Sequence, residues 1–139
     1  MRVRTSTLRV QTEGTRLKDI TRDVAAWLGA QVPEEGLLTL FVRHTSASLL
    51  IQENADPAVL YDLQRFFEKL APWSDEIYAH RTEGEDDMPA HIRAALTQTS
   101  LSVPVVKGHL ALGQWQAIYL WEHRARGQVR EVVLTYLGE

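Results

Sequence analysis

The spacing of hydrophobic residues divides the first third of the chain into two strands and a helix. Residues 3–11 alternate apolar and polar positions, which predicts an opening β-strand at a sheet edge. From Leu17 the spacing becomes helical, which predicts an amphipathic helix that ends near Gly29 or at Val32–Pro33. Residues 37–44 are apolar on both faces, which predicts a central strand that is covered on both sides.

The middle of the chain is predicted to hold a short strand and two more helices. A strand over residues 48–52 is followed by Asp56 and Pro57, which suit the N-cap and the first position of a helix. That helix is predicted to bury a stripe made of Leu60, Leu63, Phe66, Phe67 and Leu70. The next helix is predicted to take Asp87 as its N-cap and to bury Met88, Ile92, Ala95 and Leu96.

The last forty residues read as β-structure. Strands are predicted over residues 101–106, 109–112, 114–123 and 128–137, with turns at Lys107–Gly108 and at residues 124–127. Consecutive strands joined by tight turns predict an antiparallel meander. Strands mixed with a few helices indicate an α+β layered domain.

Length, charge and composition restrict the class of protein. A chain of 139 residues with 45% hydrophobic residues is predicted to form one domain, residues 1–139. A net charge of -3 argues against a nucleic-acid partner. The lack of cysteine excludes thiolate ligands, so that any metal would be bound by nitrogen and oxygen. No apolar run approaches the length of a membrane span, so we expect a cytoplasmic protein without membrane contacts.

The segment from His80 to His91 holds two of the five histidines and four carboxylates in twelve residues. Imidazoles that converge on one point can bind a transition metal, although a single histidine beside a core face is more often structural. Glu83 precedes a glycine that suits a sharp turn, and it is a candidate ligand, orienting group or general base. Asp86 is better explained as part of a solvated acidic face and Asp87 as a helix cap.

Polar residues also gather on both sides of the strand over 48–52 and near Gly113. Glu53 and Asn54 follow the strand over 48–52 and have no structural explanation in the sequence, whereas Thr45 and Ser46 suit ordinary hydrogen bonding at a strand end. Gly113 permits close backbone approach, and N–H groups near it can bind an anion. The four tryptophans are more typical of core and interface than of a ligand stack.

Several motifs in this order resemble the YjbQ family of secondary thiamine-phosphate synthases. They are HTSASLLIQENADP, HxxEG with a following AHI, LALGQWQ, YLWEHR and a terminal GE. The resemblance covers nearly the whole chain and implies a two-layer sandwich of antiparallel sheets with about three flanking helices. It also implies a homotrimer with sites near the subunit boundaries.

The resemblance further implies roles for individual residues. A divalent metal ion, zinc or magnesium, would be held by His44, His80 and His91, and Glu53 and Glu83 would serve catalysis. The phosphorylated substrate would contact Thr45, Ser46, Asn54, Gly113, Trp115 and Gln116. The chain departs from the family pattern with HTSAS for HTTA, with GQWQ for GTWQ and with a longer acidic loop, in which Asp86 or Asp87 could replace Glu83 as ligand.

The activity that the resemblance implies is a metal-assisted transfer. A pyrimidine-methyl diphosphate would be coupled to a thiazole phosphate, with release of diphosphate. The alternatives are a metal-dependent hydrolase of a phosphorylated metabolite and a non-enzymatic trimeric module that binds a metal or a phosphate metabolite.

Overall fold

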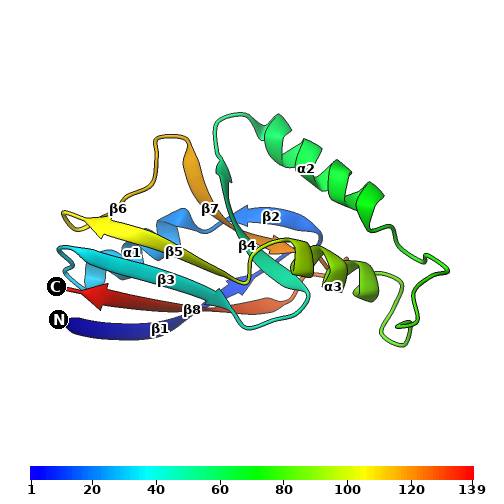
Figure 1. The fold of residues 1–139 in the computed structure, drawn as a ribbon, viewed down its shortest axis with the longest axis horizontal. Helices are drawn as coiled ribbons and strands as arrows, with labels where there is room; N and C mark the ends of the chain where they lie inside the picture. The colour runs from blue at the N-terminus through cyan, green and yellow to red at the C-terminus, as the bar shows by residue number, and fades with distance from the viewer.

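A computed structural model of residues 1–139 shows an α+β fold with two antiparallel sheets and three helices (Figure 1). The five-stranded sheet has the order β1-β8-β3-β5-β6, and the three-stranded sheet has the order β2-β7-β4. The strands are β1 Arg2–Gln11, β2 Arg16–Asp19, β3 Gly36–Val42, β4 Ala47–Glu53, β5 Ser100–Val106, β6 His109–Leu110, β7 Gln116–Glu122 and β8 Val129–Gly138. The helices are α1 Thr21–Ala30, α2 Pro57–Leu70 and α3 Asp87–Leu96. The predicted fold class is confirmed.

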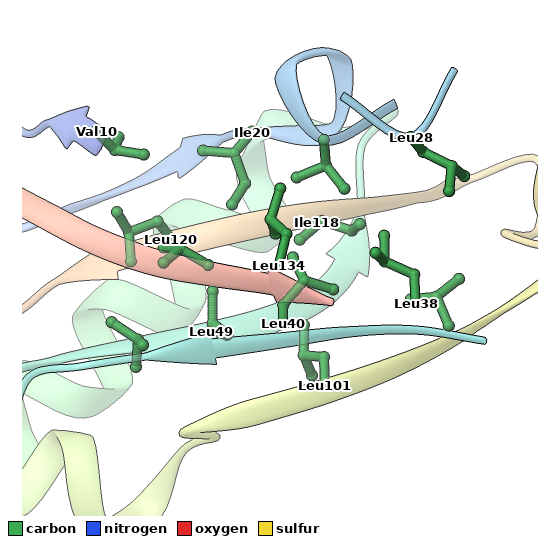
Figure 2. Close-up of a cluster of buried hydrophobic side chains, with 14 of the residues drawn as sticks. Val10, Ile20, Leu28, Leu38, Leu40, Leu49, Leu101, Ile118, Leu120 and Leu134 are labelled. Atoms are coloured by element: carbon green, nitrogen blue, oxygen red, sulfur yellow. The ribbon is translucent and has the colours of Figure 1, made fainter. Parts of the chain in front are cut away.

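The hydrophobic core lies between the two sheets and is closed by α1. Leu38 and Leu40 of β3 face Leu49 of β4 and Leu120 of β7, and α1 adds Leu28 (Figure 2). These side chains are at most 2% exposed. Each sheet therefore buries one face against the other, as expected for strands with alternating positions.

The position of β1 at a sheet edge is confirmed, and so is the central position of β3 between β8 and β5. The prediction that β3 is covered on both sides is wrong for the single chain. Leu38 and Val42 are buried, but Leu37 is 38% exposed and Phe41 is 47% exposed on the opposite face. Only one sheet packs on β3, so its second apolar face remains open.

Two of the predicted helices need correction near their first residues. The segment that begins at Leu17 is the strand β2, in which Leu17 pairs with Trp121, and α1 begins only at Thr21. Helix α3 begins at Asp87, so Asp87 is not the N-cap, and Asp86 before it makes no capping hydrogen bond with its side chain. The carboxylate of Asp87 instead faces two histidines, as described below.

The N-terminus of α2 is confirmed, since Asp56 Oδ1 accepts a hydrogen bond of 2.9 Å from the N–H of Ala58. The predicted buried stripe of α2 is wrong, because no residue of this helix is buried and Phe66 is 60% exposed. The face that α3 buries also differs from the prediction: it consists of Asp87, Pro89, Ala90 and Arg93. None of the three helices has the length and apolar character needed to cross a membrane.

The predicted meander is wrong, although its strands are in place. The β5–β6 hairpin forms through a turn at Lys107–Gly108, where both residues have positive φ. The chain then crosses to the small sheet to form β7 and returns to the large sheet to form β8. Strand β7 is buried from Ala117 to Glu122, because β2 and β4 flank it and Phe67 of α2 packs edge-on against Trp121. Helices α2 and α3 lie at the end of the molecule opposite both termini (Figure 1).

Candidate functional site

Four side chains at the start of α3 and in the loop before it form one cluster. They are His80, Glu83, Asp87 and His91, and one ligand atom of each lies within 4.8 Å of the others. Asp87 and His91 are four residues apart on α3 and so project from the same side of the helix. Gly84 has φ of 107°, a conformation that favours glycine, and this turn returns the loop toward the helix.

Asp87 lies at the centre of the cluster and its side chain is only 2% exposed. Its Oδ2 atom is 2.7 Å from His80 Nε2 and 3.1 Å from His91 Nε2. Its Oδ1 atom is 2.8 Å from Arg124 Nη1. Burial alone would raise the pKa of Asp87, but the hydrogen bond with His80 and the charge of Arg124 outweigh it and lower the pKa below its ordinary value. The carboxylate is therefore ionised at neutral pH.

The backbone fixes which nitrogen of His91 faces Asp87. Nδ1 of His91 is 2.9 Å from the carbonyl oxygen of Thr45, which can only accept, so Nδ1 carries the hydrogen. In the neutral ring, Nε2 then presents a lone pair to the carboxylate oxygen of Asp87. Two lone pairs at 3.1 Å need a proton or a metal ion between them.

The chemistry of these donors fits a divalent metal ion. Two imidazoles and two carboxylates form a nitrogen and oxygen shell of the kind found in zinc sites. The Thr45 carbonyl and Arg124 supply the outer hydrogen bonds that orient metal ligands. Among the loop carboxylates, Asp86 is not in the cluster, because its Oδ2 accepts from Arg124 Nε and from the N–H of Ala125, both at 2.9 Å.

A pocket of about 680 Å³ adjoins the cluster, and His91 belongs to both. The pocket carries two arginines, Arg43 and Arg130, and no acidic side chain. Its lining consists of Phe41, Val42, Arg43, His44, Thr45, Ser46, His91, Ala94, Ala95, Thr99 and Arg130. Arg130 is paired with Glu122 and Arg43 lies 3.9 Å from Glu131, so the pocket offers an anionic ligand guanidinium N–H donors rather than a large net charge.

His44 lines this pocket and is not part of the cluster around Asp87. Its Nε2 atom accepts a 2.9 Å hydrogen bond from the N–H of Glu131, and its Nδ1 atom lies 3.3 Å from Arg130 Nη1. Burial and the charge of Arg130 lower the pKa of His44 below its ordinary value, so the ring is neutral at pH 7. The structure thus brings together two members of the predicted histidine trio, His80 and His91, and places the third beside an arginine.

A buried ion pair supports the floor of the pocket. Arg130 is 2% exposed and its Nε donates a 2.8 Å hydrogen bond to Oε1 of Glu122, which is fully buried. Arg130 Nη2 donates to the other oxygen of Glu122, as well as to the carbonyl and the hydroxyl of Ser46. Thr12 and the N–H of Arg124 complete the partners of Glu122. Ser46, which the resemblance predicts to contact substrate, is seen here to position Arg130.

The other predicted site residues lie at the far end of β4 and β7. Glu53 pairs with Gln116 there, and seven residues of extended strand put them about 20 Å from the pocket. The N–H of Gly113 donates to Oε1 of Gln116 at 2.8 Å, and the N–H of Asn54 donates to the carbonyl of Trp115 at 2.9 Å. Within one chain, the predicted residues therefore form two separate groups.

The sequence reasoning missed three charged residues, namely Glu122, Arg124 and Arg130. A signal for two of them exists. Arg130 lies on the same face of β8 as the buried residues Val132 and Leu134, because the three occupy alternate positions. Glu122 and Leu120 share a face of β7 for the same reason. A charged side chain on the core face of a strand needs a partner, and the two residues are each other's partners. No comparable pattern marks Arg124.

Comparison with known proteins identifies the family. The family model described as UPF0047 protein YjbQ-like matches residues 6–139. UPF0047 protein sll1880 from Synechocystis sp. is 52% identical over 130 residues, which are 94% of this chain and 88% of that protein. A conserved hypothetical protein from Thermus thermophilus is 38% identical and has a similar crystal structure, with a TM-score of 0.85 over 95% of this chain and 99% of that chain. A YbjQ-like protein from Sulfolobus solfataricus, 24% identical, has the same fold, with a TM-score of 0.90 over 99% of both chains. The chain belongs to the UPF0047/YjbQ family.

Proposed function

We propose that this protein is a metal-dependent transferase that acts on phosphorylated small molecules, with a reaction like that of a secondary thiamine-phosphate synthase. A pyrimidine-methyl diphosphate would be coupled to a thiazole phosphate, and diphosphate would leave. One observation carries the proposal: His91 belongs both to the cluster around Asp87 and to the pocket that contains Arg43 and Arg130. A metal-binding group and an anion-binding pocket therefore share one wall.

The cluster favours zinc over magnesium as the metal. Imidazole suits zinc and other transition metals, whereas magnesium prefers oxygen ligands and water. A divalent ion held there would supply positive charge to a diphosphate leaving group. The chain orients its own ligands for this purpose, since the Thr45 carbonyl fixes the tautomer of His91 and Arg124 holds one oxygen of Asp87.

The pocket supports a phosphorylated substrate rather than a neutral one. Arg43 is 58% exposed and can reach an incoming anion, whereas Arg130 is held rigidly by Glu122. A volume of about 680 Å³ is in the range of small-molecule sites. Glu83, whose Oε2 atom is 3.8 Å from His80 Nε2 and whose side chain is 63% exposed, can complete the metal shell or take a proton at its edge.

We also propose that the chain forms a homotrimer. The open face of the large sheet supports it, because residues opposite each other on β1, β8, β3 and β5 form rows without charge. One row contains Val3, Leu137, Leu37 and Pro104, the next contains Thr5, Thr135, Thr39 and Ser102, and the third contains Thr7, Val133, Phe41 and Ser100. Uncharged, partly apolar faces of this kind are typical of subunit interfaces. A neighbouring subunit could also bring Glu53 and Trp115, which lie far from the pocket of their own chain, to a shared site.

The activity is tested by assaying the purified protein with both organic substrates in the presence of zinc or magnesium. Wild type should form thiamine phosphate, and His91→Ala should lose at least about 100-fold in kcat/KM because a metal ligand is removed. His109→Ala is the matched control, since His109 lies on β6 outside the cluster and the pocket. Equal turnover by wild type and His91→Ala would show that this site does not carry the reaction. Release of phosphate from a single substrate would instead indicate a hydrolase.

The trimer is tested by light scattering after gel filtration. Wild type should have three times the mass of the 15.8 kDa chain, and Phe41→Asp should shift the protein to the monomer. Val32→Asp serves as the control because Val32 is 78% exposed in the turn after α1, outside the three rows. A monomeric wild type would contradict the proposal.

A further inference from the structure

We propose that His44 and Arg130 together form an oxyanion site in the pocket and that it binds a phosphate oxygen of the substrate. In this site His44 is a hydrogen-bond donor and not a metal ligand. The inference deepens the proposed function and rests on it for the choice of phosphate as the anion. The geometry of the two donors does not depend on the proposed function.

The backbone of β8 decides the tautomer of His44. The N–H of Glu131 lies 2.9 Å from Nε2, and a backbone N–H can only donate. The N–H of Arg43 donates to the carbonyl of the same Glu131 at 3.1 Å, so the pairing of β3 with β8 continues beyond the end of β3. The His44 ring accepts the N–H of Glu131 in place of a backbone carbonyl. Nε2 is therefore without hydrogen, and the neutral ring carries its hydrogen on Nδ1.

That hydrogen on Nδ1 faces a second donor. Nη1 of Arg130 is 3.3 Å from Nδ1 of His44, and a guanidinium has no acceptor. The two N–H groups cannot satisfy each other, so both need an external acceptor. Both residues line the pocket, and an anionic oxygen with several lone pairs can accept from both. The lowered pKa of His44 agrees with a neutral ring that donates from Nδ1.

The remaining contacts of Arg130 show that this site is built into the fold. Its Nε and Nη2 atoms are used by Glu122 and Ser46, which leaves Nη1 as the nitrogen directed toward His44. The guanidinium is 2% exposed and cannot turn away without breaking these bonds. A preorganised donor of this kind needs no rearrangement to bind an anion.

The oxyanion site and the cluster around Asp87 border the same pocket, which His44, Arg130 and His91 all line. Thr45 follows His44 in the chain, and its carbonyl holds His91, which is the residue shared between the cluster and the pocket. A phosphate bound by His44 and Arg130 thus lies on the same pocket wall as the metal ligands. This arrangement is suited to a diphosphate, in which one phosphate can meet the two donors and the other the metal ion.

The tautomer is tested first, by recording long-range ¹H–¹⁵N NMR spectra of the histidine rings in the purified protein. The ring of His44, assigned by its disappearance in His44→Gln, should show a protonated Nδ1 and a bare Nε2. A ring protonated at Nε2 would overturn the proposal.

Binding is tested by calorimetric titration with inorganic phosphate. His44→Gln retains an acceptor for the N–H of Glu131 but removes the donor at Nδ1, so it should weaken phosphate binding about 10- to 100-fold. Arg130→Lys should weaken it as well, because lysine cannot keep both partners of Nε and Nη2. Arg9→Gln is the control, because Arg9 also lies beside Glu131 but does not line the pocket. The phosphate affinity of this variant should stay within about twofold of wild type.

Unchanged phosphate affinity in a folded His44→Gln variant would overturn the site. Acetate bound as tightly as phosphate would overturn the assignment to phosphate. These results are separable from the proposed transferase activity. Weakened phosphate binding by His44→Gln, with no turnover by wild type, would reject the enzyme and keep the site. Wild-type turnover with an unaltered KM in His44→Gln would reject the site and keep the enzyme.

Discussion

Two buried carboxylates, Glu122 on β7 and Asp87 on α3, are both paired with arginine. They differ in whether the other groups that contact their oxygens are hydrogen-bond donors. Glu122 accepts from Arg130, from Thr12 and from the N–H of Arg124, and each of these groups is a fixed donor. Asp87 has Arg124 on one oxygen, but its other oxygen faces two imidazoles. Only one of these can donate when both rings are neutral.

The difference separates a structural ion pair from a candidate site. A buried carboxylate whose partners all donate gains nothing from an added cation, and its role is to hold Arg130 in place. A buried carboxylate that faces a lone pair of His91 is completed by a proton or a metal ion. Burial and charge are thus similar at the two places, while the direction of the hydrogens is different.

The largest expected effect is on folding and comes from Glu122→Gln. This change leaves the charge of Arg130 buried without a counter-ion, which should lower the free energy of unfolding by about 3–5 kcal/mol. Urea unfolding followed by circular dichroism measures it. Glu131→Gln, which removes a partly exposed carboxylate near Arg9 and Arg43, should change the stability by less than about 1 kcal/mol. Equal losses in the two variants would contradict the structural role of Glu122.

Asp87→Asn should act mainly on metal binding. Loss of the central carboxylate is expected to weaken zinc affinity about 100-fold, or ~2.7 kcal/mol, because the shared ligand oxygen becomes neutral. Metal content after dialysis and competition with a chelator measure the change. Asp86→Asn is the matched control, since Asp86 contacts Arg124 and Ala125 and is outside the cluster. A chelator should also lower the melting temperature of wild type but not of Asp87→Asn.

Acid should destabilise the protein through His123, whose ring is fully buried. Burial and the charges of Arg93 and Arg130 lower the pKa of His123 to about 3, so below pH 6.5 the unfolded chain binds a proton that the folded chain excludes. Stability attributable to this group is complete above pH 6.5 and is lost as the pH falls toward 3. At about pH 5 the loss should be about 2 kcal/mol, and urea unfolding at about pH 7 and about pH 5 measures it. His123→Gln should reduce this pH dependence, and an unchanged dependence would contradict the assignment.

The smallest expected effect tests one donor to Glu122. Thr12→Val removes a hydroxyl that donates to Glu122 Oε1 at 2.5 Å and accepts from the N–H of Gln128 at 3.0 Å, and it should cost about 1–2 kcal/mol because both groups lose a partner. Thr5→Val is the control, since the hydroxyl of Thr5 meets only that of Thr135 on the open face of the large sheet. Its stability should stay within about 0.5 kcal/mol of wild type. Equal effects of the two changes would mean that the hydrogen bonds of the Thr12 hydroxyl to Glu122 and Gln128 do not stabilise the fold.

Much of the local structure could be predicted because local rules decide it. Asp56 with Pro57 marks the start of α2, and the apolar run after Gly36 marks β3 as a central strand. The predictions failed where tertiary packing chooses between two local possibilities. Leu17 suits a helix and a strand equally well, and pairing with β7 makes it part of β2. Helix α2 has an apolar stripe but lies outside the core, so the stripe is only partly covered within one chain: Phe67 packs edge-on against Trp121 of β7, whereas Phe66 and Leu70 stay exposed.

The candidate site was predictable only as an inventory of residues. His80, Glu83 and His91 were selected for their chemistry, and they do lie together. The sequence favours a cap for Asp87 and offers the ligand role only as an alternative to Glu83, because a carboxylate at a helix start suits both. The sequence offered no means of choosing between them, since the choice depends on where the loop before α3 places His80.

The sequence by itself determined the family, the positions of most helices and strands, and which side chains are available to bind a metal or an anion. Only the tertiary structure decided the directions of their hydrogens. The N–H of Glu131 sets the tautomer of His44, and the carbonyl of Thr45 sets that of His91. The physical reason is that a tautomer depends on one donor or acceptor about 3 Å away, and these partners come from strands and loops distant in the chain.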